Sequence, residues 1–161
     1  RTHAVRGRWL VLAITIGGGA LEWFRRELCR EMDRDAFYES FLPDFIAGRY
    51  RKTAVRFSPH LAGDRHSIRQ KKAAFRGLTL ESTRDDLLSA LLTGIFEPLH
   101  LVLDLYGKQL PLQREVVLTG GMVNSAYLEF KRRQFPQFTF RRVDECSTLG
   151  NARMALAALH R

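Results

Sequence analysis

The chain has 161 residues, of which 45% are hydrophobic and 11% are aromatic. This length and composition predict one globular domain with a buried core, and they exclude a disordered or fibrous protein. The net charge of +9 favours an acidic partner such as phosphate, nucleic acid or an acidic protein surface, although a basic but inert surface gives the same charge. The basic residues are spread along the chain, which argues against a nucleic-acid-binding arm.

Signals for a membrane or for secretion are weak in this sequence. The apolar run Trp9–Ile16 is far shorter than the roughly 18 residues that a membrane span requires. No signal-peptide cleavage pattern follows it. Cys29 and Cys146 are distant from each other in sequence, so they form neither a metal-ligand cluster nor a disulfide framework. We therefore expect a cytoplasmic protein that makes no membrane contact.

The N-terminal third is predicted to contain a strand and two helices. Trp9–Ile16 is apolar and rich in β-branched residues, as a buried strand is. Gly17–Ala20 is predicted to be a turn, and apolar residues at helical spacing then predict a helix over Leu21–Met32. A second, short helix follows, for which Asp35 is the predicted N-cap and which Pro43 is predicted to interrupt.

The longest predicted element is a helix in the middle of the chain, preceded by a short strand at Ala54–Phe57. Its N-terminus carries two capping-box spacings, Ser82–Asp85 and Thr83–Asp86. Pro98 lies inside the helical pattern and is predicted to kink it near Gly94, since proline has no N–H to donate. The predicted core face of this helix consists of Leu87, Leu88, Leu91, Leu92, Ile95, Phe96, Leu99 and Leu103.

The C-terminal third alternates strands and helices. Strands are predicted at Arg114–Leu118 and Phe138–Val143, with a helix over about Val123–Gln134 between them. A final helix is predicted over Leu149–His160, with Ser147 as its N-cap. The order of elements along the chain predicts an α/β layered domain.

Thr119, Gly120 and Gly121 link a predicted strand to a predicted helix. Glycines at this place leave backbone N–H groups open, and the positive end of the helix dipole favours the phosphate or sugar edge of a nucleotide. A tight turn that needs glycine dihedrals and binds nothing has the same sequence. Gly17–Gly19 is a second turn of this kind, and neither is a Walker motif because no Lys-Ser/Thr follows.

Candidate catalytic residues are scarce. Asp64 and His66 lie in one loop and could do acid–base chemistry, although neighbouring loop residues more often form local hydrogen bonds and ion pairs. The five histidines have no metal-ligand spacing, and no nucleophile motif is present. We therefore predict no metal site and no catalytic residue within this sequence.

The ordered set of motifs resembles the C-terminal domain of the FGGY carbohydrate kinases, the family of xylulokinase and glycerol kinase. The stretches that carry the resemblance are Gly18–Phe24, Phe57–Arg65, Phe75–Ala90, Leu118–Gly121 and Cys146–Ala152. In order along the chain, these stretches extend the resemblance over nearly the whole of it. The departures from the family pattern are Leu91, Thr93, Pro98, Met122 and Asn151.

This resemblance implies a ribonuclease H-like, actin-like ATPase fold, with a mixed sheet that lacks its first strands and is flanked by helices. It implies that ATP binds between the two glycine segments. Gly18 and Glu22 would lie on one side of the nucleotide, and Gly120, Gly121 and Ser125 would lie on the other. Mg²⁺ would be held mainly through the nucleotide phosphates.

The resemblance also implies that residues 1–161 form one domain, the nucleotide-binding lobe of a two-lobe kinase. The catalytic base and most of the sugar pocket would belong to an N-terminal lobe outside this sequence, so this lobe alone is expected to be inactive. Asp64 and Arg65 are predicted to face the cleft. The alternatives are a nucleotide-binding regulatory module without catalysis and, less favoured, a basic nucleic-acid-binding domain.

Overall fold

The computed structural model describes residues 7, 17–63, 70–120 and 125–159 of the chain. The predicted strand Trp9–Ile16 therefore lies outside the described residues. The helices are α1 (Gly17–Leu28), η1 (Ala36–Phe41), α2 (Leu42–Asp44), η2 (Phe45–Arg49), α3 (Arg84–Gly94), α4 (Glu97–Gly107), α5 (Ser125–Gln134) and α6 (Cys146–Leu159). The strands are β1 (Arg56–Ser58), β2 (Ala74–Arg76), β3 (Glu115–Leu118) and β4 (Thr139–Arg142).

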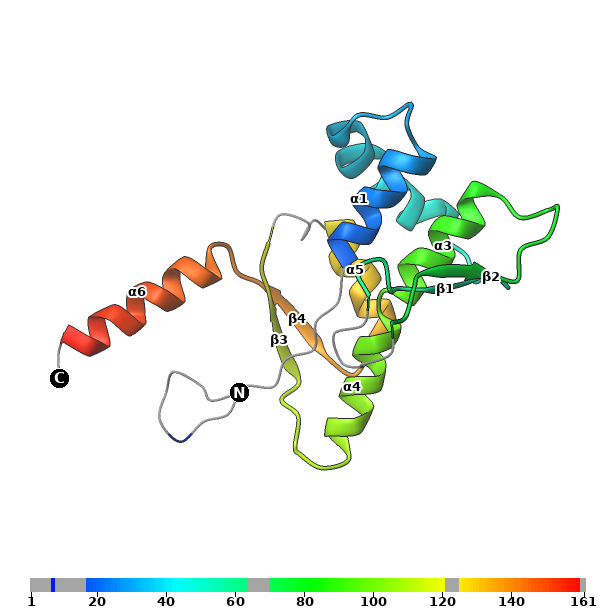
Figure 1. The fold of residues 1–161 in the computed structure, drawn as a ribbon. Helices are drawn as coiled ribbons and strands as arrows, with labels where there is room; N and C mark the ends of the chain where they lie inside the picture. The colour runs from blue at the N-terminus through cyan, green and yellow to red at the C-terminus, as the bar shows by residue number, and fades with distance from the viewer. Residues whose placement is uncertain (1–6, 8–16, 64–69, 121–124, 160–161) are drawn as a thin grey trace.

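The described strands form two small sheets. β1 and β2 are antiparallel, with Phe57 opposite Phe75. β3 and β4 are parallel, with Val116 opposite Phe140, and α5 connects them. The α/β class is therefore confirmed, but the described strands form two separate pairs rather than one mixed sheet. Figure 1 shows α3 beside β1 and β2, α4 running from it to the lower edge of the view, and α6 extending away from the body beyond β3 and β4.

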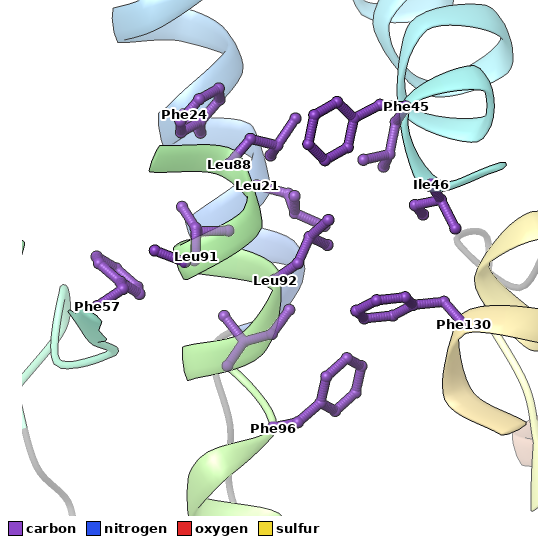
Figure 2. Close-up of a cluster of buried hydrophobic side chains, with 14 of the residues drawn as sticks. Leu21, Phe24, Phe45, Ile46, Phe57, Leu88, Leu91, Leu92, Phe96 and Phe130 are labelled. Carbon is purple, nitrogen blue, oxygen red and sulfur yellow. The ribbon is translucent and has the colours of Figure 1, made fainter. Parts of the chain in front are cut away.

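The hydrophobic core surrounds α3. Leu88, Leu91 and Leu92 on this helix are completely buried, and α1, β1 and the end of α5 contribute further buried side chains. Figure 2 shows Leu21 of α1 and Phe130 of α5 in this one cluster. Aromatic residues supply much of its volume, because the largest fully buried side chains are Phe24, Phe37, Phe45, Phe130 and Phe135.

The start and the break of the long predicted helix are both confirmed. The Thr83 hydroxyl accepts from the Asp86 backbone N–H, and the Asp86 carboxylate accepts from the Thr83 N–H, so the predicted capping box is formed. The helix stops at Gly94, and α4 restarts at Glu97 with Pro98 in its first turn. Proline is well tolerated there, because the first N–H groups of a helix have no partner within it.

Among the described residues, Arg84–Gly107 is the single stretch that is long and apolar enough to cross a membrane. It has 24 residues and a mean hydropathy of 1.5. It consists of α3 and α4, and the break at Pro98 divides it. Since α3 is the central core helix, burial within the protein accounts for the apolar composition of that half. The stretch is weak evidence for a membrane span.

The N-terminal helices differ from the prediction in three ways. Gly17–Gly19 form the first turn of α1 and not a separate turn. Asp35 directly precedes η1 as predicted but makes no capping hydrogen bond with its side chain, and the Asp33 carboxylate instead accepts from the Ala36 N–H at 2.8 Å. That helix is also not interrupted at Pro43, and two segments with wide turns, η1 and η2, lie on either side of the proline.

The wide turns explain why Pro43 is accommodated. In a regular α-helix a proline ring collides with the carbonyl four residues earlier, and a wide turn with i→i+5 bonding relieves such strain. Here the Leu42 N–H, directly before the proline, donates to the Phe37 carbonyl five residues earlier. The ring of Phe41 stacks on Phe37 and on Phe45, with centroids 5.5 and 6.2 Å apart. Aromatic packing thus holds the helix together across the irregular turns.

The last helix also begins earlier than predicted. α6 starts at Cys146, so Ser147 lies in its first turn and is not the N-cap. The Leu149 N–H donates to the Glu145 carbonyl, and Glu145 has a φ of 52°. No residue of α6 is buried.

Asp86 ties the start of α3 to the segment before β1. Its carboxylate accepts from the Thr83 hydroxyl at 2.8 Å and from Arg51 Nη2 at 2.9 Å, in addition to the Thr83 N–H. These hydrogen bonds, the one from the Thr83 backbone being the largest cause, lower the pKa of Asp86 from 3.8 to about 2. The charged carboxylate is therefore favoured in the folded state.

We expect Asp86→Asn to flatten the acid dependence of stability. A depressed folded-state pKa contributes stability that is fully present above pH 3.8 and is lost as the pH falls toward about 2. Urea unfolding at several pH values in this range will show a smaller decline for the variant than for the wild type. Asp85→Asn removes the same charge one residue earlier and serves as the control. Equal acid dependence of the Asp86 variant and the wild type would contradict the role assigned to this carboxylate.

Candidate functional site

The turn after β3 contains a glycine whose backbone conformation is one that glycine readily adopts. β3 ends at the buried Leu118, whose carbonyl accepts from the Val143 N–H at 2.9 Å, while Thr119 and Gly120 are exposed. Gly120 has a φ of +113°, which L side chains rarely adopt, and the space around its Cα is open. Glycine is therefore required by the backbone conformation and not by crowding. The turn leaves the carboxyl end of a parallel strand, where α/β proteins commonly bind ligands.

The first turn of α1 is the second glycine segment. Gly18 and Gly19 are exposed, and Gly17 is half-buried beside the Ile95 side chain. The first four N–H groups of a helix have no partner within it, and they carry the positive end of the helix dipole. An exposed helix start built from glycines can therefore approach an anion closely. The prediction of a separate turn was wrong, because Gly17–Gly19 are the first residues of α1.

Glu22 takes part in a hydrogen-bond network on α1. Its carboxylate accepts from Arg25 Nη2 at 2.7 Å and from the Tyr38 hydroxyl at 3.2 Å. Arg25 also donates to the Met32 carbonyl at 3.0 Å. The hydrogen bond from Arg25 lowers the pKa of Glu22, and burial raises the pKa of Tyr38 to about 12. Glu22 is therefore an ionised, fixed acceptor at neutral pH.

The structure describes only part of the predicted nucleotide site. Ser125 is the first described residue of α5. Gly121, Asp64 and Arg65 lie outside the described residues. The helices that carry the two halves of the predicted site share one hydrophobic core, in which Leu21 of α1 and Phe130 of α5 are both buried (Figure 2).

Comparisons with known proteins bear on the fold. No protein-family model matches the chain, and no curated protein sequence is significantly similar to it. Among solved structures, the chain is similar to the crystal structure of xylulose kinase from Rhodospirillum rubrum, with a TM-score of 0.59 and 22% sequence identity. The match covers 80% of this chain and 26% of the kinase, so the chain spans about a quarter of that protein's length. The chain has a sugar-kinase-like fold.

The structure also reveals polar residues of this sugar-kinase-like domain that the sequence did not indicate. The Tyr50 hydroxyl lies 3.1 Å from Thr93 Oγ1, and Gln134 Nε2 donates to Tyr50 at 3.4 Å. These residues come from three separate segments of the chain, so no spacing in the sequence connects them. Thr93, one of the residues that depart from the pattern described above, is thus part of a hydrogen-bonded row with Tyr50 and Gln134.

Much of the positive charge is neutralised locally. Many arginines on the surface pair with carboxylates a few residues away, among them Arg25–Glu22, Arg26–Glu27, Arg30–Glu27, Arg133–Glu129 and Arg142–Asp144. These pairs join residues close in the sequence, and the net charge of +9 is the excess that remains after all carboxylates are counted. Among the described residues, no group of three His, Cys, Asp or Glu side chains could hold a metal ion.

Proposed function

We propose that this chain is the nucleotide-binding lobe of an ATP-dependent sugar kinase of the cytoplasm. The complete enzyme would transfer the γ-phosphoryl group of MgATP to a hydroxyl of a ketose, a polyol or a related sugar. The observation that carries the proposal is the similarity in fold to a xylulose kinase over 80% of this chain. The exposed positive-φ Gly120 at the carboxyl end of β3 agrees with it.

The phosphates would bind at the two glycine segments. The exposed helix start at Gly18 offers open N–H groups and a partial positive charge. On the other side, Gly120, Gly121 and Ser125 would hold the nucleotide from the turn after β3. Mg²⁺ would be held mainly through the nucleotide phosphates.

Glu22 would recognise the base. Its carboxylate is held by Arg25 and Tyr38, and a fixed carboxylate accepts hydrogen bonds from an exocyclic amino group such as that of adenine. In-line phosphoryl transfer depends on positioning and charge neutralisation between donor and acceptor sites. The catalytic base and most of the sugar pocket would be supplied by a lobe outside this sequence, so the chain alone would hold the donor without transferring its phosphate.

We expect the 161-residue chain to bind ATP without turnover. Isothermal titration calorimetry with MgATP should give saturable binding of one nucleotide per chain, and ADP should compete. A radiolabelled-phosphate transfer assay with xylulose should give no product from the chain alone. Absence of binding at millimolar MgATP would contradict the nucleotide-binding proposal. In a longer protein that contains the second lobe, binding without transfer to any sugar would favour the regulatory alternative.

A further inference from the structure

A cavity lies beside the junction of α3 with α4. Its volume is about 550 Å³, within the range of roughly 300–1,000 Å³ that is typical of small-molecule sites. The segment Tyr50–Phe57, the junction of α3 with α4 and the end of α5 line it. Of the proposed nucleotide residues that the structure describes, Gly18, Glu22 and Gly120 do not line it, so we treat its occupant as distinct from the nucleotide.

One wall of the cavity is a row of hydroxyl and amide groups. Thr93 Oγ1 donates to the Ser89 carbonyl at 2.9 Å, which leaves its lone pairs to accept from the Tyr50 hydroxyl at 3.1 Å. Gln134 Nε2 donates to Tyr50 in turn. Among the described residues, the amide oxygen of Gln134 and its second N–H have no further partner, so both can bind a ligand. Such a wall is suited to a molecule that carries several hydroxyl groups.

Two cationic side chains give another part of the cavity a positive charge. Lys52 and Arg56 line the cavity and are exposed. Among the residues that the structure describes, no carboxylate pairs with either, and Arg56 donates only to the Thr53 carbonyl, at 2.9 Å. Arg56 is also directly opposite Arg76 in the β1–β2 ladder, and like charges at opposite positions destabilise a strand pair. An anion in the cavity would relieve this repulsion.

Glu97 is the carboxylate among the lining residues, and it pairs with neither cation. The charge of Lys52, Arg56 and Glu97 together is therefore positive. The remaining surface includes Val55 and Phe57, which are apolar and nearly buried, and which can contact the C–H face of a ligand. The cavity thus combines hydroxyl-binding, anion-binding and apolar surfaces.

We propose that this cavity binds a small organic anion that carries several hydroxyl groups, such as a sugar phosphate or a sugar acid. The anionic group lies at Lys52 and Arg56, and the hydroxyl groups contact the row formed by Tyr50, Thr93 and Gln134. The site is separate from the proposed nucleotide site, so its occupancy can be measured with no nucleotide present.

Titration of the ¹⁵N-labelled chain with four probes tests the required chemistry. Glucose 6-phosphate and gluconate carry both features, glucose carries only hydroxyl groups, and inorganic phosphate carries only charge. We expect the amide signals of Lys52, Thr93 and Gly94 to shift with one or both of the first two probes. Glucose and phosphate should each bind at least about tenfold more weakly. Glucose lacks the charge-assisted hydrogen bonds to the two cations, and phosphate lacks the neutral hydrogen bonds to the hydroxyl and amide groups. The difference between glucose 6-phosphate and gluconate identifies the preferred anionic group.

Variants distinguish this site from general attraction by the basic surface. Lys52→Ala/Arg56→Ala should weaken binding of the better probe about tenfold or more. Arg34→Ala/Arg153→Ala removes the same charge at exposed positions away from the cavity and should leave the affinity unchanged. Thr93→Val keeps the side-chain shape but removes the hydroxyl, and should weaken binding of the hydroxyl-bearing anions without affecting inorganic phosphate.

Equal losses in the two double variants would overturn the proposal, as would binding of inorganic phosphate as tight as that of glucose 6-phosphate. Absence of any shift at Lys52, Thr93 and Gly94 with both organic anions would also overturn it. Circular dichroism of each variant verifies that it is folded. If the Lys52/Arg56 variant is unfolded, Thr93→Val and the comparison of the four probes still decide the matter. None of these results depends on whether the chain binds ATP.

Discussion

Replacing Gly94 by alanine is expected to lower the free energy of unfolding by about 3 kcal/mol. A Cβ at this position would lie 2.4 Å from the carbonyl oxygen of Phe57 and 3.2 Å from its carbonyl carbon. Both are backbone atoms of β1, so the contact cannot be relieved by rotating a side chain. The end of α3 would have to move away from β1, which would open the core around Phe57 and Leu91. Urea unfolding of the variant and the wild type measures the difference.

Gly150→Ala is the matched control for this prediction. Gly150 lies inside α6, and no heavy atom is within 4 Å of the position of its Cβ. Alanine is favoured over glycine inside a helix by about 0.5–1 kcal/mol, so this variant should be unchanged or slightly more stable. If Gly94→Ala is as stable as Gly150→Ala, then α3 and β1 do not pack backbone to backbone as described.

The sequence was informative where local chemistry decides the structure. The capping box at Thr83 and Asp86 is formed, and the helix breaks before Pro98, because capping and proline effects act over a few residues. The strand–helix–strand order of β3, α5 and β4 also agrees with the hydrophobic pattern. In each case neighbouring residues determine the outcome, and tertiary contacts do not oppose it.

The predictions failed at helix ends and at irregular turns. A glycine segment indicated a turn, yet Gly17–Gly19 are helical, since glycine permits a turn without requiring one. Asp33 and Asp35 are both suitable N-caps by residue type, and only the path of the chain decides between them. The wide turns around Pro43 have no recognisable signal in the sequence, because the stacking of Phe37, Phe41 and Phe45 supports them.

In the candidate sites, too, the sequence indicated the local features but not the contacts between distant segments. The sequence indicated Gly120 through its place after a strand, and the structure gives it a positive φ. The ion pair between Glu22 and Arg25 also follows from their i,i+3 spacing on a helix. The contact of Tyr50 with Thr93 and Gln134 joins residues far apart in the chain, so it required the fold. Which groups face one cavity is a property of tertiary packing.

Gly120→Val is expected to weaken ATP binding by about a hundredfold or more, which corresponds to roughly 2.7 kcal/mol. Valine cannot readily adopt the φ of +113° found at this position, so the turn would rearrange and its N–H groups would point elsewhere. The side chain would also project into the open space beside the turn, where the proposed nucleotide lies. Since Gly120 is exposed, folding should be affected far less than binding, and calorimetric titration with MgATP measures the loss.

Gly63→Val separates loss of the site from general backbone strain. Gly63 also has a positive φ, +78°, and open space around its Cα, but it lies after β1 and not after β3. Both variants should lose a similar amount of stability, about 1–2 kcal/mol for a left-handed conformation forced on an L residue. Only Gly120→Val should lose nucleotide affinity. Retention of affinity in Gly120→Val would show that the turn after β3 is a structural feature alone. The proposal that this turn contacts the nucleotide would then be wrong.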